Sequence, residues 1–156
     1  MSKTLEIRPA TPEDLAVLAG FIRALAAHHG ETATIGEARL ALLLFGARRS
    51  GAALVALQAG MPVGFAGTVP FVRLNSGERG TEVQHLYVRP EHRGRGVGRA
   101  LVEAAAELAA ADGHAWLTIG TKADNRAAQR AYRAMGLDDL PAAGPRFGRR
   151  LGNVMA

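Results

Sequence analysis

The 156-residue sequence contains no cysteine, which excludes a disulfide scaffold, thiol catalysis and thiolate metal sites. It has no apolar run long enough to span a membrane, and its opening segment, MSKTLEIRPATPEDL, lacks the apolar stretch of a signal peptide. We therefore expect a cytoplasmic protein without a membrane span. The length is that of one folded domain, covering residues 1–156.

Lysine is nearly absent, so the formal net charge of +5 is carried almost entirely by arginine. Arginine is the better phosphate binder, because its planar guanidinium donates paired hydrogen bonds. A basic protein can bind nucleic acid, an acidic partner or a polyanionic small molecule. Only 5% of the residues are aromatic, which argues against the stacking platforms of a nucleic-acid-binding surface. The five histidines have no metal-ligand spacing, so we expect no metal site.

The apolar pattern predicts an α/β fold that is not the strict strand-helix alternation of a dinucleotide-binding protein. Glycines are expected to end three of the helices, at Gly30, Gly113 and Gly136. The tail after Leu137 is broken by glycine and proline and should hold at most two short strands. Strands are expected at 5–10, 52–60, 62–72, 81–88 and 115–121, and helices at 11–29, 36–48, 96–111 and 124–135.

The segment RGRGVG (93–98) lies between a predicted strand and a predicted helix. Glycines allow close approach to the backbone, the first helical amides lack internal acceptors, and the helix dipole favours an anion. The glycine spacing fits neither a Rossmann fingerprint nor a P-loop. Because Arg93, Arg95 and Arg99 surround the helix start, an anion site is favoured over a solvated turn.

This segment resembles the acyl-CoA signature R/Q-x-x-G-x-G/A of the GNAT superfamily of N-acetyltransferases. The segments EIRPATPEDL, LYVRPEHRG and LTIGTKADNRAAQRAYRAMGL resemble the opening and flanking segments of the same family. The resemblance implies one N-acetyltransferase domain with a mixed, mainly antiparallel sheet flanked by helices. It also implies that the sheet splays between its fourth and fifth strands, with acetyl-CoA in the gap and its pyrophosphate on the loop amides. Homodimers are common in that family.

The resemblance also implies roles for individual residues. Asn125 would bind the pantetheine arm, the backbone N–H of Leu86 would donate to the thioester oxyanion, and Tyr132 would protonate the leaving thiolate. The alternatives are a helix-capping Asn125 and a Tyr132 that only packs. The implied cofactor-binding residues are Leu86, Tyr87, Val88, Arg93, Gly94, Arg95, Gly96, Val97, Gly98, Arg99, Asn125, Ala128 and Tyr132.

Transfer to an amine requires a base, because an amine with a pKa of about 10.4 is almost fully protonated at neutral pH. Glu82 occupies the family's base position, although it could be a solvated strand-end glutamate. His85 is a second candidate, since imidazole titrates near neutrality. Regular strand alternation places Glu82 with Leu86 on one face and His85 with Tyr87 on the other, unless a bulge reverses the count.

The expected function is acetyl transfer from acetyl-CoA to a primary amine, by direct attack in a ternary complex. Two other classes stay open, a basic binding module for nucleic acid or an acidic partner and a CoA-binding regulator without catalysis. Diamine and thialysine acetyltransferases, which LYVRPEHRG also resembles, carry an acidic pair where this chain has Gln84 and His85. The acceptor pocket is expected to come from the first two helices, the RLNSGERG loop (73–80) and the tail.

Overall fold

A computed structural model describes residues 4–152 of the chain. The chain forms two compact units, Met1–Gly120 and Thr121–Ala156. The first unit holds a five-stranded sheet and its helices, and the second holds one helix and the tail. The expectation of one N-acetyltransferase domain over 1–156 stays a prediction.

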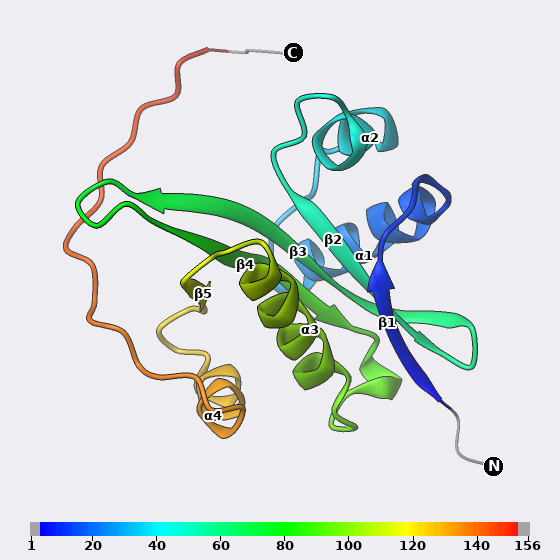
Figure 1. Ribbon diagram of the computed structural model, residues 1–156. Coiled ribbons are helices and arrows are strands. Elements are labelled where there is room, and N and C mark those ends of the chain that lie inside the picture. Colours follow the sequence, from blue (N-terminus) through cyan, green and yellow to red (C-terminus); the bar gives the residue numbers. More distant parts are fainter. Residues whose placement is uncertain (1–3, 153–156) are drawn as a thin grey trace. The chain divides into compact units, whose positions relative to one another are not determined.

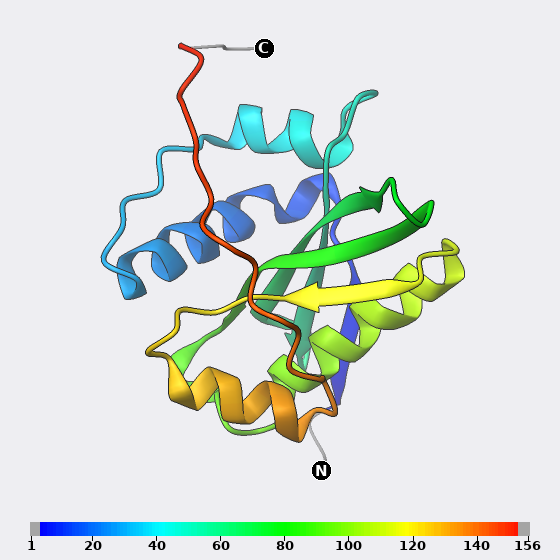
Figure 2. The ribbon, with the colours of Figure 1, turned by 90° about the vertical axis from the view of Figure 1, so that its left-hand side faces the viewer.

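The strands of the sheet follow one another in space in the order β1-β2-β3-β4-β5. The first three pairs are antiparallel, and β4 pairs with β5 in parallel. Figure 2 shows β5, in yellow, alongside the green hairpin of β3 and β4. This mixed, mainly antiparallel sheet confirms the predicted fold class. The strands are β1 (Leu5–Pro9), β2 (Ala52–Gln58), β3 (Met61–Arg73), β4 (Glu78–Val88) and β5 (Trp116–Ile119).

Helices cover both faces of the sheet, with α3 on one side and α1 and α2 on the other (Figure 1). Strand β2 is apolar on both faces for this reason. Its side chains Ala53, Val55 and Leu57 pack with α1 and α2, while Leu54 and Ala56 pack with α3. The helices are α1 (Leu15–His28), preceded by the short 3₁₀ helix η1 (Pro12–Asp14), α2 (Glu37–Phe45) and α3 (Val97–Ala111).

The hairpin between β3 and β4 is longer than the sequence suggests. The polar segment 73–80 predicts a loop, but Arg73 and Glu78 are paired in register and only the residues between them form the turn. Gly77, with φ of +72°, takes the left-handed conformation that this tight turn needs. Most of the expected loop is therefore part of the paired β3–β4 hairpin.

The second unit contains α4 (Arg126–Ala134) and the tail. The helix ends in a Schellman motif, in which the amides of Gly136 and Leu137 donate to the carbonyls of Arg133 and Tyr132 over 3.0 and 3.1 Å. Gly136 has a φ of +87°, as predicted for a helix-ending glycine. The described tail up to Gly152 has no strand, where the sequence predicted at most two short ones.

Candidate active site

The glycine loop leads from the end of β4 into α3. Gly94 and Gly96 have φ values of +71° and +82°, which side-chain-bearing residues rarely adopt. Gly96 is the N-cap of α3 and has no side chain to accept from the first helical amides. The amides of Val97, Gly98 and Arg99 are therefore the donors that a bound anion can satisfy.

Two of the three loop arginines already have partners within the protein. Arg93 donates from Nε to the carbonyl of Val88 over 2.8 Å, and Arg99 forms a 2.9 Å salt bridge with Glu103 one turn along α3. Within the described residues, Arg95 has no such partner. Arg93 keeps its two terminal nitrogens outside this hydrogen bond, and the Arg99 pair is exposed, so all three arginines can still assist the backbone amides at a phosphate.

Strands β4 and β5 separate beyond Val83. Their pairing covers Gly80 to Val83, and no described residue of β5 pairs with β4 after that point. The end of β4 packs instead against the first turn of α3, where a Cβ on Gly98 would lie 3.9 Å from the side chains of Leu86 and Val88. This opening confirms the predicted splay and leaves a backbone edge of β4 without a strand partner.

Two of the predicted cofactor-binding residues can act only through their backbone. The side chain of Tyr87 is buried, with its ring 5.2 Å from that of Phe21. The side chain of Val97 is buried in the α3-side core. Their peptide groups lie at the open edge of β4 and at the start of α3, and these are the groups left for a ligand.

A β-bulge at Gln84 overturns the predicted face assignment of β4. Gly67 pairs with His85 but Thr68 pairs with Val83, so Gln84 between them has no partner residue on β3. Val83 therefore packs on the α3 side, as Leu86 does. Glu82 and His85 both lie on the opposite face, the one that α1 and α2 cover further along the sheet.

The surroundings of His85 favour a neutral ring. The imidazole stacks on Phe65 with 6.5 Å between centroids. Partial burial lowers the pKa of His85, and the nearby His29 lowers it further, while Glu31 opposes this. At neutral pH the ring is thus able to accept a proton.

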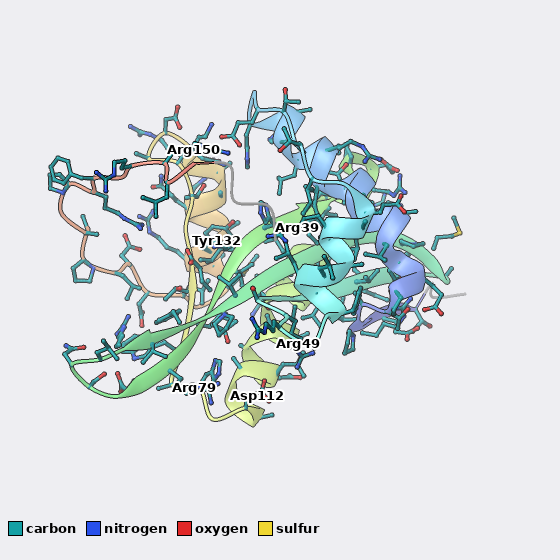
Figure 3. The ribbon with its side chains drawn as sticks, turned by 90° about the horizontal axis from the view of Figure 1, so that it is seen from above. Arg39, Arg49, Arg79, Asp112, Tyr132 and Arg150 are labelled. Carbon is teal, nitrogen blue, oxygen red and sulfur yellow. The ribbon has the colours of Figure 1, made fainter. Side chains whose placement is uncertain are left out.

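In the second unit, Asn125, Ala128 and Tyr132 occupy one face of α4, since they are three, four and seven residues apart. Asn125 is the N-cap, and its side-chain oxygen accepts from the amide of Ala128 over 3.1 Å. Its side-chain NH₂ group is not used by this cap. Partial burial raises the pKa of Tyr132, shown on α4 in Figure 3, which keeps its hydroxyl protonated at neutral pH.

Among residues 4–152, no group of three acidic, histidine or cysteine side chains is arranged to hold a metal ion. In the same part of the chain, no helix is long and apolar enough to cross a membrane.

The fold and the loop together define an α/β protein in which a glycine loop with uncapped helix-start amides lies beside a splayed sheet. A family model described as the acetyltransferase (GNAT) family matches residues 21–137. The chain belongs to this family, as the signature at 93–98 predicted.

Individual curated relatives match this chain over shorter stretches than the family model does. A thialysine N-epsilon-acetyltransferase of Bos taurus is 34% identical over 65 residues, which are 42% of this chain and 38% of that protein. An L-methionine sulfoximine/L-methionine sulfone acetyltransferase of Pseudomonas paraeruginosa is 35% identical over 78 residues, 48% of this chain and 45% of that protein. The chain thus matches less than half the length of these curated relatives.

Solved structures share the fold over nearly the whole chain. An aminoglycoside N-acetyltransferase in complex with CoA superimposes with a TM-score of 0.77, covering 97% of both chains at 20% identity. At this identity the likeness concerns the fold alone.

Sequence reasoning missed that Glu82 and His85 share a face. A bulge leaves little trace in the sequence, because it is defined by the pairing with the partner strand. The signal available was Gln84, a polar residue that regular alternation would have placed on the same face as the apolar Leu86 and Val88.

Proposed function

We propose that the protein transfers the acetyl group of acetyl-CoA to a primary amine, by direct attack in a ternary complex. The observation that supports this most is the set of uncapped amides at Val97 to Arg99, next to the part of β4 that has no β5 partner. Amides at a helix start suit a pyrophosphate, and an unpaired strand edge suits the amide-bearing pantetheine arm. A structural neighbour of the same fold was solved with CoA.

The reaction needs a base, for which the chain has two candidates on one face of β4. In the proposal Glu82 takes the proton of the acceptor ammonium, through a water molecule if the distance requires one. His85 is the alternative base, and its partly buried, neutral ring suits that role. Once unprotonated, the amine attacks the thioester carbonyl carbon. The carbon–sulfur bond then breaks to release a thiolate, and the nitrogen loses its second proton to water as it becomes the amide nitrogen.

The oxyanion and the thiolate need donors. The backbone N–H of Leu86, on the unpaired part of β4, is proposed to stabilise the carbonyl oxygen as it becomes negative. Tyr132 is proposed to give its hydroxyl proton to the thiolate. Its raised pKa suits a group that must be protonated before the step. Asn125 and Ala128 are proposed to bind the pantetheine arm.

The absence of cysteine makes the direct test clean, because the only thiol formed is that of the product CoA. A panel of primary amines is incubated with acetyl-CoA and the purified protein, and free thiol is followed with a chromogenic disulfide. We expect thiol release that depends on both the protein and the amine. If calorimetry shows that CoA binds but no amine yields free thiol, the protein is a CoA-binding regulator and not a transferase.

A further inference from the structure

A row of three residues crosses the sheet two residues before Glu82. Phe71, Gly80 and Trp116 are direct neighbours in register on β3, β4 and β5. The ring of Phe71 occupies the space above Gly80, where a Cβ would clash with it. The following residue, Leu117, packs on the α3 side, so Trp116 faces the other way.

An arginine lies over these rings. The guanidinium of Arg73 is 4.3 Å from the ring centroid of Trp116 and 5.7 Å from that of Phe71. Stacking on aromatic faces fixes its plane but uses none of its N–H donors. Within residues 4–152, the guanidinium has no salt bridge or hydrogen bond.

The carboxylate paired in register with Arg73 is that of Glu78, and the charge of Arg73 acts on it although no hydrogen bond joins the two. Glu78 accepts from Nε1 of Trp116 over 2.9 Å and from the hydroxyl of Ser76 over 3.1 Å. These donors, the Trp116 hydrogen bond first, lower the pKa of Glu78 and keep it charged. The rings thus hold the guanidinium of half-buried Arg73, whose N–H groups have no hydrogen-bond acceptor among residues 4–152.

This cluster and the candidate base lie on the same face of β4. Gly80 and Glu82 are two positions apart on the strand, which is about 6.8 Å. An acceptor whose amine reacts beside Glu82 and which extends along the strand therefore passes over Phe71 and Trp116 toward Arg73. That reach suits an aliphatic chain with the amine at one end and an anionic group at the other.

We infer that Arg73 binds the carboxylate of the acceptor, and that the acceptor is an aliphatic amino acid that reacts through the amine at the far end of its side chain. This rests on the proposed function for the identity of the reacting group. The carboxylate would accept paired hydrogen bonds from the guanidinium, which the aromatic rings hold in place. The methylene chain would lie against the rings.

The test uses 6-aminohexanoate and hexylamine, which differ only by the carboxylate. Trp116 is the only tryptophan, so its emission reports on ligands at this cluster without any turnover. The variants are Arg73→Gln and, as a control of equal charge change, Arg79→Gln. Arg79 lies on the side of the sheet that α3 covers, as Asp112 at the end of α3 does (Figure 3).

We expect 6-aminohexanoate to bind the parent protein and the Arg79 variant at least tenfold more tightly than hexylamine. In Arg73→Gln its affinity should fall about ten- to hundredfold, since charged hydrogen bonds are lost, while that of hexylamine stays. Thiol release from acetyl-CoA should show the same preference in kcat/KM.

Equal affinities for the two amines in the parent protein would overturn the inference, as would an Arg73 variant that keeps the preference. If the emission discriminates between them but no amine yields thiol, the proposed transfer fails and the carboxylate site stands. If thiol is released equally from both amines, the transfer stands and the carboxylate site fails. Arg73 would then have only a structural role, packing the β3–β4 hairpin against Trp116 of β5.

Discussion

Glu82 and His85 lie on the same face of β4 although they are three positions apart in the sequence. In a regular strand their side chains would point to opposite faces. The bulge at Gln84 sets two residues of β4 against one of β3. The side chains beyond it therefore point to the face opposite to the one that regular alternation from Glu82 would give. Both candidate bases therefore lie on the side of the sheet opposite to α3.

The first prediction concerns Glu82→Gln. The variant should be slower than the parent protein at neutral pH and should be partly rescued at alkaline pH, where more of the amine is already unprotonated. The measurement is the pH profile of kcat/KM with one acceptor. CoA affinity serves as the control and should not change.

The variant His85→Ala tests the alternative, in which His85 is the base. If His85 is the base, this variant loses the acidic limb of the profile and Glu82→Gln keeps it. Because burial lowers the pKa of His85, that limb should then lie below the ordinary imidazole value of about 6.5. Such a result would assign the base to His85 and leave Glu82 a role in orientation.

The second prediction concerns Tyr132→Phe, which removes only a hydroxyl. Turnover should fall by roughly ten- to a thousandfold if this hydroxyl protonates the thiolate. Thermal stability and CoA affinity should barely change, because the ring and its packing remain. Pre-steady-state kinetics must show that chemistry limits the rate. An unaltered chemical step would make Tyr132 a packing residue.

The third prediction tests the anion site at the start of α3. Gly96→Ala places a methyl group where the backbone must approach the pyrophosphate, so the CoA affinity measured by calorimetry should drop at least tenfold. The left-handed conformation also strains alanine, which alone would cost about 1 kcal/mol of stability.

Gly113→Ala controls for that strain. Gly113 has nearly the same φ, +79° against +82°, and neither added Cβ would meet another atom within 4 Å. Both variants should lose similar stability, and only the Gly96 variant should lose CoA affinity. Equal losses of affinity would remove the phosphate assignment of the loop.

The fourth prediction concerns stability at acid pH. Buried Asp14 accepts from the Arg8 guanidinium over 2.7 and 3.1 Å and from the Thr11 amide over 2.8 Å. The Arg8 hydrogen bond first of all lowers the pKa of Asp14 in the folded state. Its stabilisation is therefore present above the usual carboxyl pKa and is lost as the pH falls below it.

Asp14→Asn should cost about 1–3 kcal/mol of unfolding free energy at neutral pH, because one partner of a charged pair is removed. The loss should shrink toward acid pH, which denaturant unfolding at several pH values would measure. Asp112→Asn, at an exposed helix end, is the control and should change little. A penalty that does not depend on pH would contradict the role of this ion pair.

Much of the fold could be predicted because it depends on local sequence. A glycine after an apolar helix can take the left-handed conformation that closes it, so Gly113 and Gly136 mark the ends of α3 and α4. Asn125 accepts an amide hydrogen bond at the start of α4, as its residue type suggests. The glycine loop before α3 was recognised in the same way.

The pairing of strands was not predictable in this detail. Whether Glu82 faces Leu86 or His85 depends on one unpaired residue at Gln84, and only the partner strand decides it. The contact of Arg73 with Trp116 joins residues 43 positions apart through the register of three strands. The sequence by itself determined most of the elements, the glycine ends of the helices and the family, because these follow from neighbouring residues. The tertiary structure decided which side chains share a face, because register is a property of two chain segments together.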